Sequence, residues 1–357
     1  MNEEYQLFID KYVPQSFDMV MFNHECAKKL VACSKAIDIP HMIIKGCVGT
    51  GRKTFATLYL KEKYHLNNIP THNQRVEIKV TSKKISLLLL YSDYHYIIDP
   101  SVHGVYDRLI IQGFLKDILQ TKPISIVPYH TIIIMNADKL TIEAQQSLRR
   151  TLEKNVGSCR FIFIIEQEKT LIEPLISRCI QMRLSSPTTS QITDVLKNMC
   201  VHEKISYNIE QIQHIAHYSD RNVTKAMNTL QYISSINPSM LISPRPIDFS
   251  QININDQYLE ELYQHLINAK QPTDILDLRQ NIYLLLVQCV EPVDIMKKLY
   301  LHMVQHIKEN KKPNCMVFRL TNMLSKYENT LKQGSKPIYH IEGFVVSIAE
   351  RLANTFP

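Results

Sequence analysis

The chain has 357 residues, of which 45% are hydrophobic, and its formal net charge at pH 7 is +7. This composition excludes a disordered or collagen-like chain, and the length exceeds that of one ordinary core, so two or three domains are expected. No run of 18 or more apolar residues is present, so we expect neither a membrane span nor a membrane partner. The moderate positive charge is compatible with a polyanionic partner but does not identify one.

The cysteines and histidines predict reduced thiols rather than a metal or disulfide framework. The eight cysteines contain no C-x-x-C pair, and the fourteen histidines include no H-E-x-x-H motif, so no metal site is expected. The first residues, Met1 to Tyr5, are acidic and polar, so no secretory signal is expected. Abundant Ile, Asn and Tyr with no Trp are typical of an A+T-rich genome, such as that of a large DNA virus.

Between about residues 39 and 183, short β-branched runs alternate with segments of helical period. This alternation predicts a parallel sheet covered by helices, the α/β architecture of nucleotide-binding folds. The predicted strands are Met42 to Lys45, Val76 to Val80, Thr131 to Met135 and Arg160 to Ile165. Residues 141–155 are predicted as a helix, because inward-facing positions recur every three or four residues from Ile142 to Leu152.

Two breaks divide the chain into three predicted domains. The segment Ser185 to Ser190 is rich in Ser, Thr and Pro, and its last hydroxyl residues can cap a following helix. The Pro-rich segment Ser243 to Pro246 marks the second break. We therefore predict an α/β domain over residues 1–185, a small helical domain over 186–243 and a second helical domain over 244–357. The last domain is predicted either to pack only against itself or to form an oligomer interface.

A glycine-rich loop follows the first predicted strand. It reads Gly46-Cys47-Val48-Gly49-Thr50-Gly51-Arg52-Lys53-Thr54, and apolar residues follow. Glycines let backbone N–H groups wrap an anion, and a helix N-terminus behind them attracts negative charge. The order strand, loop, helix therefore predicts that these residues bind the phosphates of ATP or ADP. A loop that serves only as a turn is the alternative.

The end of this loop departs from the G-x4-G-K-[ST] rule. Arg52 takes the Lys position and Lys53 takes the Ser/Thr position, so the hydroxyl that holds Mg²⁺ is missing. Using Lys53 and Thr54 instead shifts the register by one residue, which turns a side chain by about 100° around the helix and off the phosphates. We therefore expect a degenerate nucleotide site with weak or absent Mg²⁺ binding.

The second element of such a site is also altered. Hydrolysing P-loop proteins end an apolar strand with carboxylates that hold Mg²⁺ and act on the attacking water. Here the strand ends in Met135 and Asn136, and neither side chain can replace a carboxylate. Asp138 follows two residues later and is expected to cap or hydrogen bond at the turn rather than to catalyse.

Several further segments resemble the small subunits of replication factor C. Residues Asp10 to Pro14 are similar to the family's opening D-K-Y-R-P, with Val13 at the Arg position. Ala144 to Glu153 resembles its A-Q-x-x-L-R-R-x-x-E helix, and Ser177-Arg178-Cys179 matches its S-R-C motif. The segment Leu331 to Phe344 is similar to the collar of the subunit 3 type, which also carries a doubled basic pair in its phosphate loop.

The resemblance implies an AAA+ P-loop module followed by a helical lid and an all-α collar. It also implies a hetero-pentamer that loads a sliding clamp of the PCNA type onto primer-template DNA, in the nucleus or, for a viral protein, at a cytoplasmic replication site. Two further family positions are altered, because the sensor Asn falls on Glu166 and the lid sensor Arg falls on Thr224. Self-catalysis is therefore not expected.

The S-R-C arginine of this family reaches the ATP of the adjacent subunit, so the resemblance gives Arg178 the role of a trans arginine finger. It also places the clamp contact on the helix near residues 107–118. The apolar residues expected to make it are Ile110, Ile111, Phe114 and Leu115, with core packing as their alternative role.

The alternative for the whole chain is an active AAA+ ATPase that remodels its target through a non-standard site. Met135 and Asn136 separate the two functions, because the sequence offers no nearby carboxylate in place of the lost pair.

Overall fold

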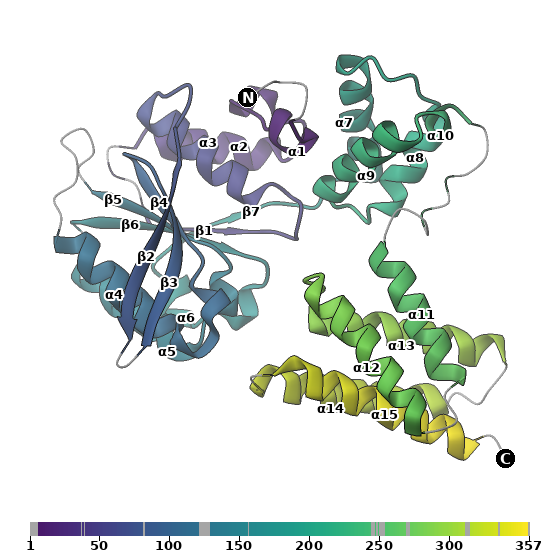
Figure 1. The fold of residues 1–357 in the computed structure, drawn as a ribbon. Coiled ribbons are helices and arrows are strands. Elements are labelled where there is room, and N and C mark those ends of the chain that lie inside the picture. Colours follow the sequence, from purple (N-terminus) through teal and green to yellow (C-terminus); the bar gives the residue numbers. More distant parts are fainter. Residues whose placement is uncertain are drawn as a thin grey trace. The chain divides into compact units, whose positions relative to one another are not determined.

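The computed structural model describes residues 6–355, except 37, 39, 81–82, 121–128, 156, 244–246, 248, 250–253, 269–271, 311–314 and 335. The chain divides into two compact units, Met1–Ile247 and Asp248–Pro357 (Figure 1). Across the described part of the chain, every helix is too short or too polar to cross a membrane.

The first unit contains a seven-stranded sheet in the order β2-β3-β4-β5-β6-β1-β7 (Figure 1). The strands are β1 Met42–Lys45, β2 His72–Val80, β3 Lys83–Tyr91, β4 His95–Ile98, β5 His130–Ile134, β6 Cys159–Ile165 and β7 Ile180–Arg183. The four predicted strands and the predicted α/β fold are confirmed, and the sheet is mixed, because one edge of it is antiparallel. There β2 and β3 pair antiparallel with each other, and β3 pairs antiparallel with β4. Only two residues separate β2 from β3, which suffices for a hairpin but not for a parallel crossover.

Helices cover both faces of the sheet (Figure 1). One core lies under α2 (His24–Ser34) and α3 (Arg52–Tyr64), and the other lies under α4 (Asp107–Gln120), α5 (Ile142–Lys154) and α6 (Glu173–Ile176). Successive residues of β6 alternate between the two cores: Phe161 and Phe163 face α4 and α5, whereas Ile162 and Ile164 face α2 and α3. Because both faces are covered, the central strands consist mostly of apolar runs, such as Phe161 to Ile165 of β6, as parallel strands usually do.

The C-terminal part of the first unit is helical, as predicted. It contains α7 Thr189–His202, α8 Ile209–Tyr218, α9 Val223–Ile236 and α10 Ser239–Ile242. Thr188 begins α7 with a reciprocal capping box: its hydroxyl accepts the N–H of Gln191, whose side chain accepts the N–H of Thr188. The predicted capping is therefore confirmed. The domain boundary at 185/186 lies inside this unit and stays a prediction, and residues 244–246 of the second predicted break lie outside the described residues.

The second unit is all-α, as predicted. Its helices are α11 Ile254–Asn268, α12 Pro272–Val287, α13 Pro292–Glu309, α14 Cys315–Gln333 and α15 Pro337–Thr355. They share one apolar core that includes Leu262, Leu299 and Phe344. Leu284 and Val287 of α12 remain exposed, and the use of this unit as an oligomer interface stays a prediction.

The helix predicted near residues 107–118 is α4, but its apolar face points inward. Ile110 and Ile111 are 0% exposed, and Phe114 and Leu115 are 3% exposed, within the core under α4 and α5. The prediction that these four side chains contact a clamp is therefore wrong. Helical spacing identifies the apolar face of a helix, and this face covers the sheet.

Candidate nucleotide site and arginine finger

The phosphate loop has the predicted position between β1 and α3. Gly49 and Gly51 have φ values of +78° and +80°, which other residues rarely adopt. The Thr50 hydroxyl is buried and donates to the carbonyl of Cys47 at 2.8 Å, so the loop is closed on itself. The backbone N–H groups at the start of α3 follow immediately, in the arrangement that favours an anion.

Arg52 and Lys53 differ in their surroundings. The Nη1 atom of Arg52 is buried and has no hydrogen-bond partner among the residues that the structure describes, whereas Lys53 is exposed. A buried donor without a partner is costly, and a phosphate oxygen would satisfy it. This donor and the two left-handed glycines fit a nucleotide phosphate, and they would hold it without the magnesium hydroxyl of the usual loop.

The lid helix α9 reaches the loop at Gly49. A Cβ atom on Gly49 would lie 1.9 Å from Oδ1 of Asn222, so only glycine fits there. Asn222 caps α9, because its Oδ1 accepts the N–H of Lys225 at 3.0 Å. Its contact with the loop was not predicted, since the sequence signal of a cap is local and does not reveal a distant neighbour.

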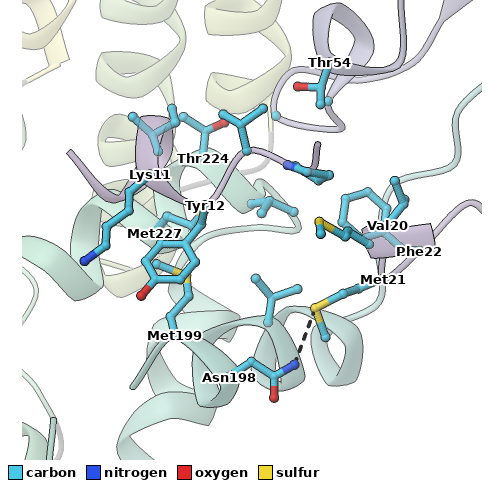
Figure 2. Close-up of a pocket in the computed structure, with 18 of the residues that line it drawn as sticks. Lys11, Tyr12, Val20, Met21, Phe22, Thr54, Asn198, Met199, Thr224 and Met227 are labelled. Atoms are coloured by element: carbon cyan, nitrogen blue, oxygen red, sulfur yellow. Dashed lines mark hydrogen bonds between the residues drawn. The ribbon is translucent and has the colours of Figure 1, made fainter. Parts of the chain in front are cut away.

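A cavity of about 440 Å³ opens beside the loop, between the N-terminal segment and the lid (Figure 2). Its walls are mostly apolar and include Val20, Met21, Phe22, Met199 and Met227. Thr54 lines the cavity with Gly49 and Gly51, and Thr224, at the lid sensor position, lines it from α9. An apolar pocket beside a phosphate loop suits a nucleotide with its base in the pocket.

The N-terminal segment is tied to the lid. Lys11 Nζ lies 2.7 Å from a carboxylate oxygen of Glu203, and the Tyr12 hydroxyl donates to the same oxygen at 2.6 Å. Burial, followed by the hydrogen bond to Glu203, raises the pKa of Tyr12. The N–H of Phe8 donates to Oε1 of Gln231 on α9 at 2.9 Å. The segment that resembles D-K-Y-R-P therefore closes one side of the cavity.

Two carboxylates surround the end of β5, and both are engaged. Asn136 has a left-handed backbone, and its Nδ2 donates to Oδ2 of Asp99 at 2.6 Å. Asp99 also accepts the N–H and the hydroxyl of Ser101. Asp138 accepts the N–H groups of Glu166 and Gln167 at 3.2 Å, which supports its expected role at the turn. Asp99 directly follows β4, a strand that the sequence did not predict, so its approach to Asn136 was not foreseen; whether a carboxylate replaces the lost pair stays a prediction.

Arg178 lies at the amino ends of the parallel strands, opposite the end where the phosphate loop lies. It comes just before β7, whose first N–H, at Ile180, donates to the carbonyl of His41 ahead of β1. The phosphate loop instead leaves the carboxyl end of β1, roughly 10 Å further along the strand. The side chain of Arg178 is 38% exposed, and its Nη2 lies 2.7 Å from Oε1 of Glu153. Its Nη1 donates to the carbonyl of Pro174 at 2.8 Å.

Gln145 holds the segment that carries Arg178. This buried side chain donates to the carbonyls of Leu140 and Thr170 at 3.0 Å and accepts the N–H of Ile172 at 2.9 Å. The Gln of the A-Q-x-x-L-R-R motif therefore fixes the connection from β6 to α6. The sequence marked Gln145 by its helical period and by the family resemblance, but not its bonds to Thr170 and Ile172, because these partners lie 25 and 27 residues away.

Two family models match this chain. Residues 24–188 match DNA polymerase III, delta subunit, and residues 256–355 match Replication factor C subunit 3, C-terminal domain. The chain is 30% identical to probable replication factor C subunit 3 of Dictyostelium discoideum, over 95% of this chain and 96% of the relative. It is also 30% identical to replication factor C subunit 3 of Homo sapiens, over 95% and 94% of the two chains.

A solved structure shares the fold of a large part of this chain. The RuvB Holliday junction branch migration motor of Thermotoga maritima aligns with a TM-score of 0.50 at 15% identity, over 72% of this chain and 79% of that chain. The sheet, the phosphate loop and the lid thus define an AAA+ P-loop module. With relatives that match along nearly its whole length, the chain belongs to the replication factor C small-subunit family.

Proposed function

We propose that this chain occupies one position in a hetero-oligomeric clamp loader, has a degenerate nucleotide site and lends Arg178 to the nucleotide of the adjacent subunit. The observation that carries the proposal is the position of Arg178, exposed at the edge of the sheet opposite the phosphate loop of its own chain. An arginine at this end of the strands is too far from the phosphate loop of its own chain to contact a nucleotide bound there. A finger given in trans stabilises charge on the transferred phosphoryl group and does not require the donor's own site to work.

The nucleotide site of this chain is proposed to bind ATP or ADP with little or no Mg²⁺ and to hydrolyse it poorly. Residues 46–54 retain the glycine cradle and a buried, unpartnered arginine donor. Asn136 stands where the strand should end in a carboxylate, and Asp138 is occupied at the turn. Nucleotide binding depends on the glycine loop and its donors, whereas hydrolysis also depends on the carboxylates, so this chain can bind a nucleotide without hydrolysing it.

The proposed partners follow from family membership. They are the other clamp-loader subunits, a sliding clamp of the PCNA type and primer-template DNA, and the expected location is the nucleus. A viral source, with a cytoplasmic replication site, stays a prediction. DNA binding is expected only from the assembled ring, since one subunit of modest charge offers few phosphate contacts.

The clamp contact is now proposed at the start of α4 rather than on its buried face. Val102 and Tyr106 of the 3₁₀ segment Pro100–Tyr106, and Leu109 of α4, are exposed apolar side chains in one short stretch of chain. Such a group is unusual on a surface that only water contacts. The replacements Val102→Ser and Leu109→Ser should weaken clamp binding, whereas Ile142→Ser, at an exposed residue of α5, is the control.

A second candidate function rests on Asp99. This carboxylate touches Asn136, so it could replace the missing acid and make the chain an ATPase that remodels its target in its own right. Three donors already occupy its two oxygens, which favours a structural role. If Asp99 acts on water, Asp99→Asn should abolish a turnover site that belongs to this chain.

Reconstitution tests the proposed function. The chain, mixed with the other loader subunits, should give one complex whose mass includes a single copy, and this complex should load the clamp onto primer-template DNA. Arg178→Ala should slow loading in proportion to the neighbouring site's contribution, while Arg52→Ala should leave loading nearly intact. Failure of the chain to enter the complex would contradict the proposal.

A further inference from the structure

Glu153, in the last turn of α5, is the shared acceptor of two arginines. Its Oε1 lies 2.7 Å from Nη2 of Arg178 and 3.1 Å from Nε of Arg149. The hydrogen bond from Arg149, the charge of both arginines and the hydrogen bond from Arg178 lower the pKa of Glu153. The carboxylate is therefore ionised at neutral pH, and the three side chains together carry one net positive charge.

The guanidinium of Arg178 is held from two sides. Nη2 donates to Glu153 of α5, and Nη1 donates to the carbonyl of Pro174 in α6, one turn before it. A guanidinium has five N–H donors in one plane, and Nη1 also lies 3.5 Å from the Ser177 hydroxyl, which accepts its second hydrogen. The Nε–H and the second hydrogen of Nη2 remain. That pair of donors forms an edge that matches two oxygens of a phosphate.

Arg149 offsets the negative charge of Glu153, which would otherwise repel a phosphate that approaches Arg178. A lone Glu153 beside an incoming phosphate would repel it, but Arg149 shares the same oxygen and leaves the cluster cationic. Arg149 also fixes Glu153 along the helix as an i, i+4 partner. The cluster can therefore hold Arg178 in place and still attract an anion.

We infer that Glu153 is a positioning residue, which holds the Arg178 guanidinium in the orientation that presents its remaining edge to the phosphates of the adjacent subunit. The inference rests on the proposed function of Arg178. Without Glu153 the long side chain of Arg178 samples many rotamers, and fewer of them align with the transferring phosphoryl group. The expected loss is therefore in kcat of the adjacent site rather than in its KM for ATP.

The test uses the assembled loader with the adjacent subunit's site as the only active one. Glu153→Gln should lower kcat by about tenfold with KM for ATP within twofold, and Glu153→Asp should lose about threefold because it keeps the charge but is one methylene shorter. Glu143→Gln is the matched control: Glu143 is exposed on the same helix, pairs with Arg108 instead, and should leave kcat unchanged. In the Arg178→Ala background, Glu153→Gln should have no further effect.

The outcomes separate this inference from the proposed function. If Arg178→Ala leaves the adjacent turnover intact, both are overturned. If Arg178→Ala abolishes turnover while Glu153→Gln matches wild type, only the positioning role is lost. A rise in kcat with Glu153→Gln would overturn it too, because the carboxylate would then restrain the finger. The positioning role would also be overturned if Glu153→Gln lowered kcat further in the Arg178→Ala background. Thermal melts of each variant establish that the chain still folds.

Discussion

The two ends of the parallel strands, the carboxyl edge and the amino edge of the sheet, are proposed to differ in how much of a working site they retain. At the carboxyl edge we propose a degenerate nucleotide site, in which Arg52, Lys53 and Asn136 depart from the usual P-loop pattern while the glycine backbone of the loop is intact. At the amino edge, Arg178 is exposed and is held by Glu153, and Gln145 fixes the segment before it. The two features lie at opposite ends of the parallel strands. Substitutions in the nucleotide site at the carboxyl edge can therefore leave the position of Arg178 at the amino edge unchanged.

The largest effect is expected at the amino edge. Arg178→Ala should cut turnover at the adjacent subunit's site by about a thousandfold, roughly 4 kcal/mol, because a finger stabilises charge that develops only in the transition state. Single-turnover ATP hydrolysis by the assembled loader measures it. Arg178→Lys is the control that keeps the charge but loses the planar fork, and it should recover only a small part. An unchanged rate in Arg178→Ala would show that Arg178 does not contribute to ATP hydrolysis at the adjacent subunit's site.

The buried face of α4 gives the next largest effect. Phe114→Ala should lower the free energy of unfolding of the chain by about 3 kcal/mol or more, because it leaves a cavity in the core that supports both edges. Leu109→Ala, on the same helix but 42% exposed, should cost less than about 1 kcal/mol. Urea unfolding of the isolated chain compares them. Equal losses would mean that α4 does not pack as described.

Acid should lower the free energy of unfolding of the chain. His95, at the amino end of β4, is 0% exposed, and burial, followed by the charge of Lys53, lowers its pKa to about 4. Between this value and the unfolded pKa of about 6.5 the unfolded chain binds the proton more strongly, so stability falls as pH falls through this window. The loss is at most about 3 kcal/mol. Unfolding measured from pH 7 to pH 4 should show a shallower slope for His95→Gln. An equal slope would assign the acid sensitivity to other groups.

The smallest predicted effect concerns the cradle at the carboxyl edge. Gly49→Ala places a Cβ against Asn222 and strains a positive φ, which should weaken ATP binding about tenfold, or about 1.4 kcal/mol. Adding Asn222→Ala should recover part of this loss, because the clash is removed while the backbone strain remains. Titration with a fluorescent ATP analogue measures the affinities. A Gly49→Ala chain that binds ATP as tightly as wild type would mean that the loop does not hold the phosphates.

Local patterns in the sequence predicted the parts of the fold that local forces determine. The phosphate loop, the α5 helix and the capping at Thr188 follow from glycines, helical period and hydroxyl caps, all of which act within a few residues. Strands β3, β4 and β7 were not predicted: β3 has no alternation in its sequence, β4 has only four residues, and β7 has mostly exposed side chains at a sheet edge. The apolar face of α4 was found but assigned to the wrong neighbour, because periodicity does not say what covers a face.

The contacts that define the candidate site depend on distant residues. Asp99 and Asn136 are 37 residues apart, Glu153 and Arg178 are 25 apart, and Lys11 and Glu203 join opposite ends of the first unit. No short motif encodes such pairs. The motif residues themselves were predictable from the family resemblance, whereas the side chains that hold them in place became visible only in the folded chain.

Turnover by this chain's own site tests the central claim most directly. In a loader whose other subunits all carry disabled phosphate loops, ATP hydrolysis should not exceed that of a complex with every loop disabled, and neither Arg52→Ala nor Asp99→Asn should change it. Steady turnover above this background, abolished by Arg52→Ala or by Asp99→Asn, would contradict the account and make the carboxyl edge of this chain a working ATPase.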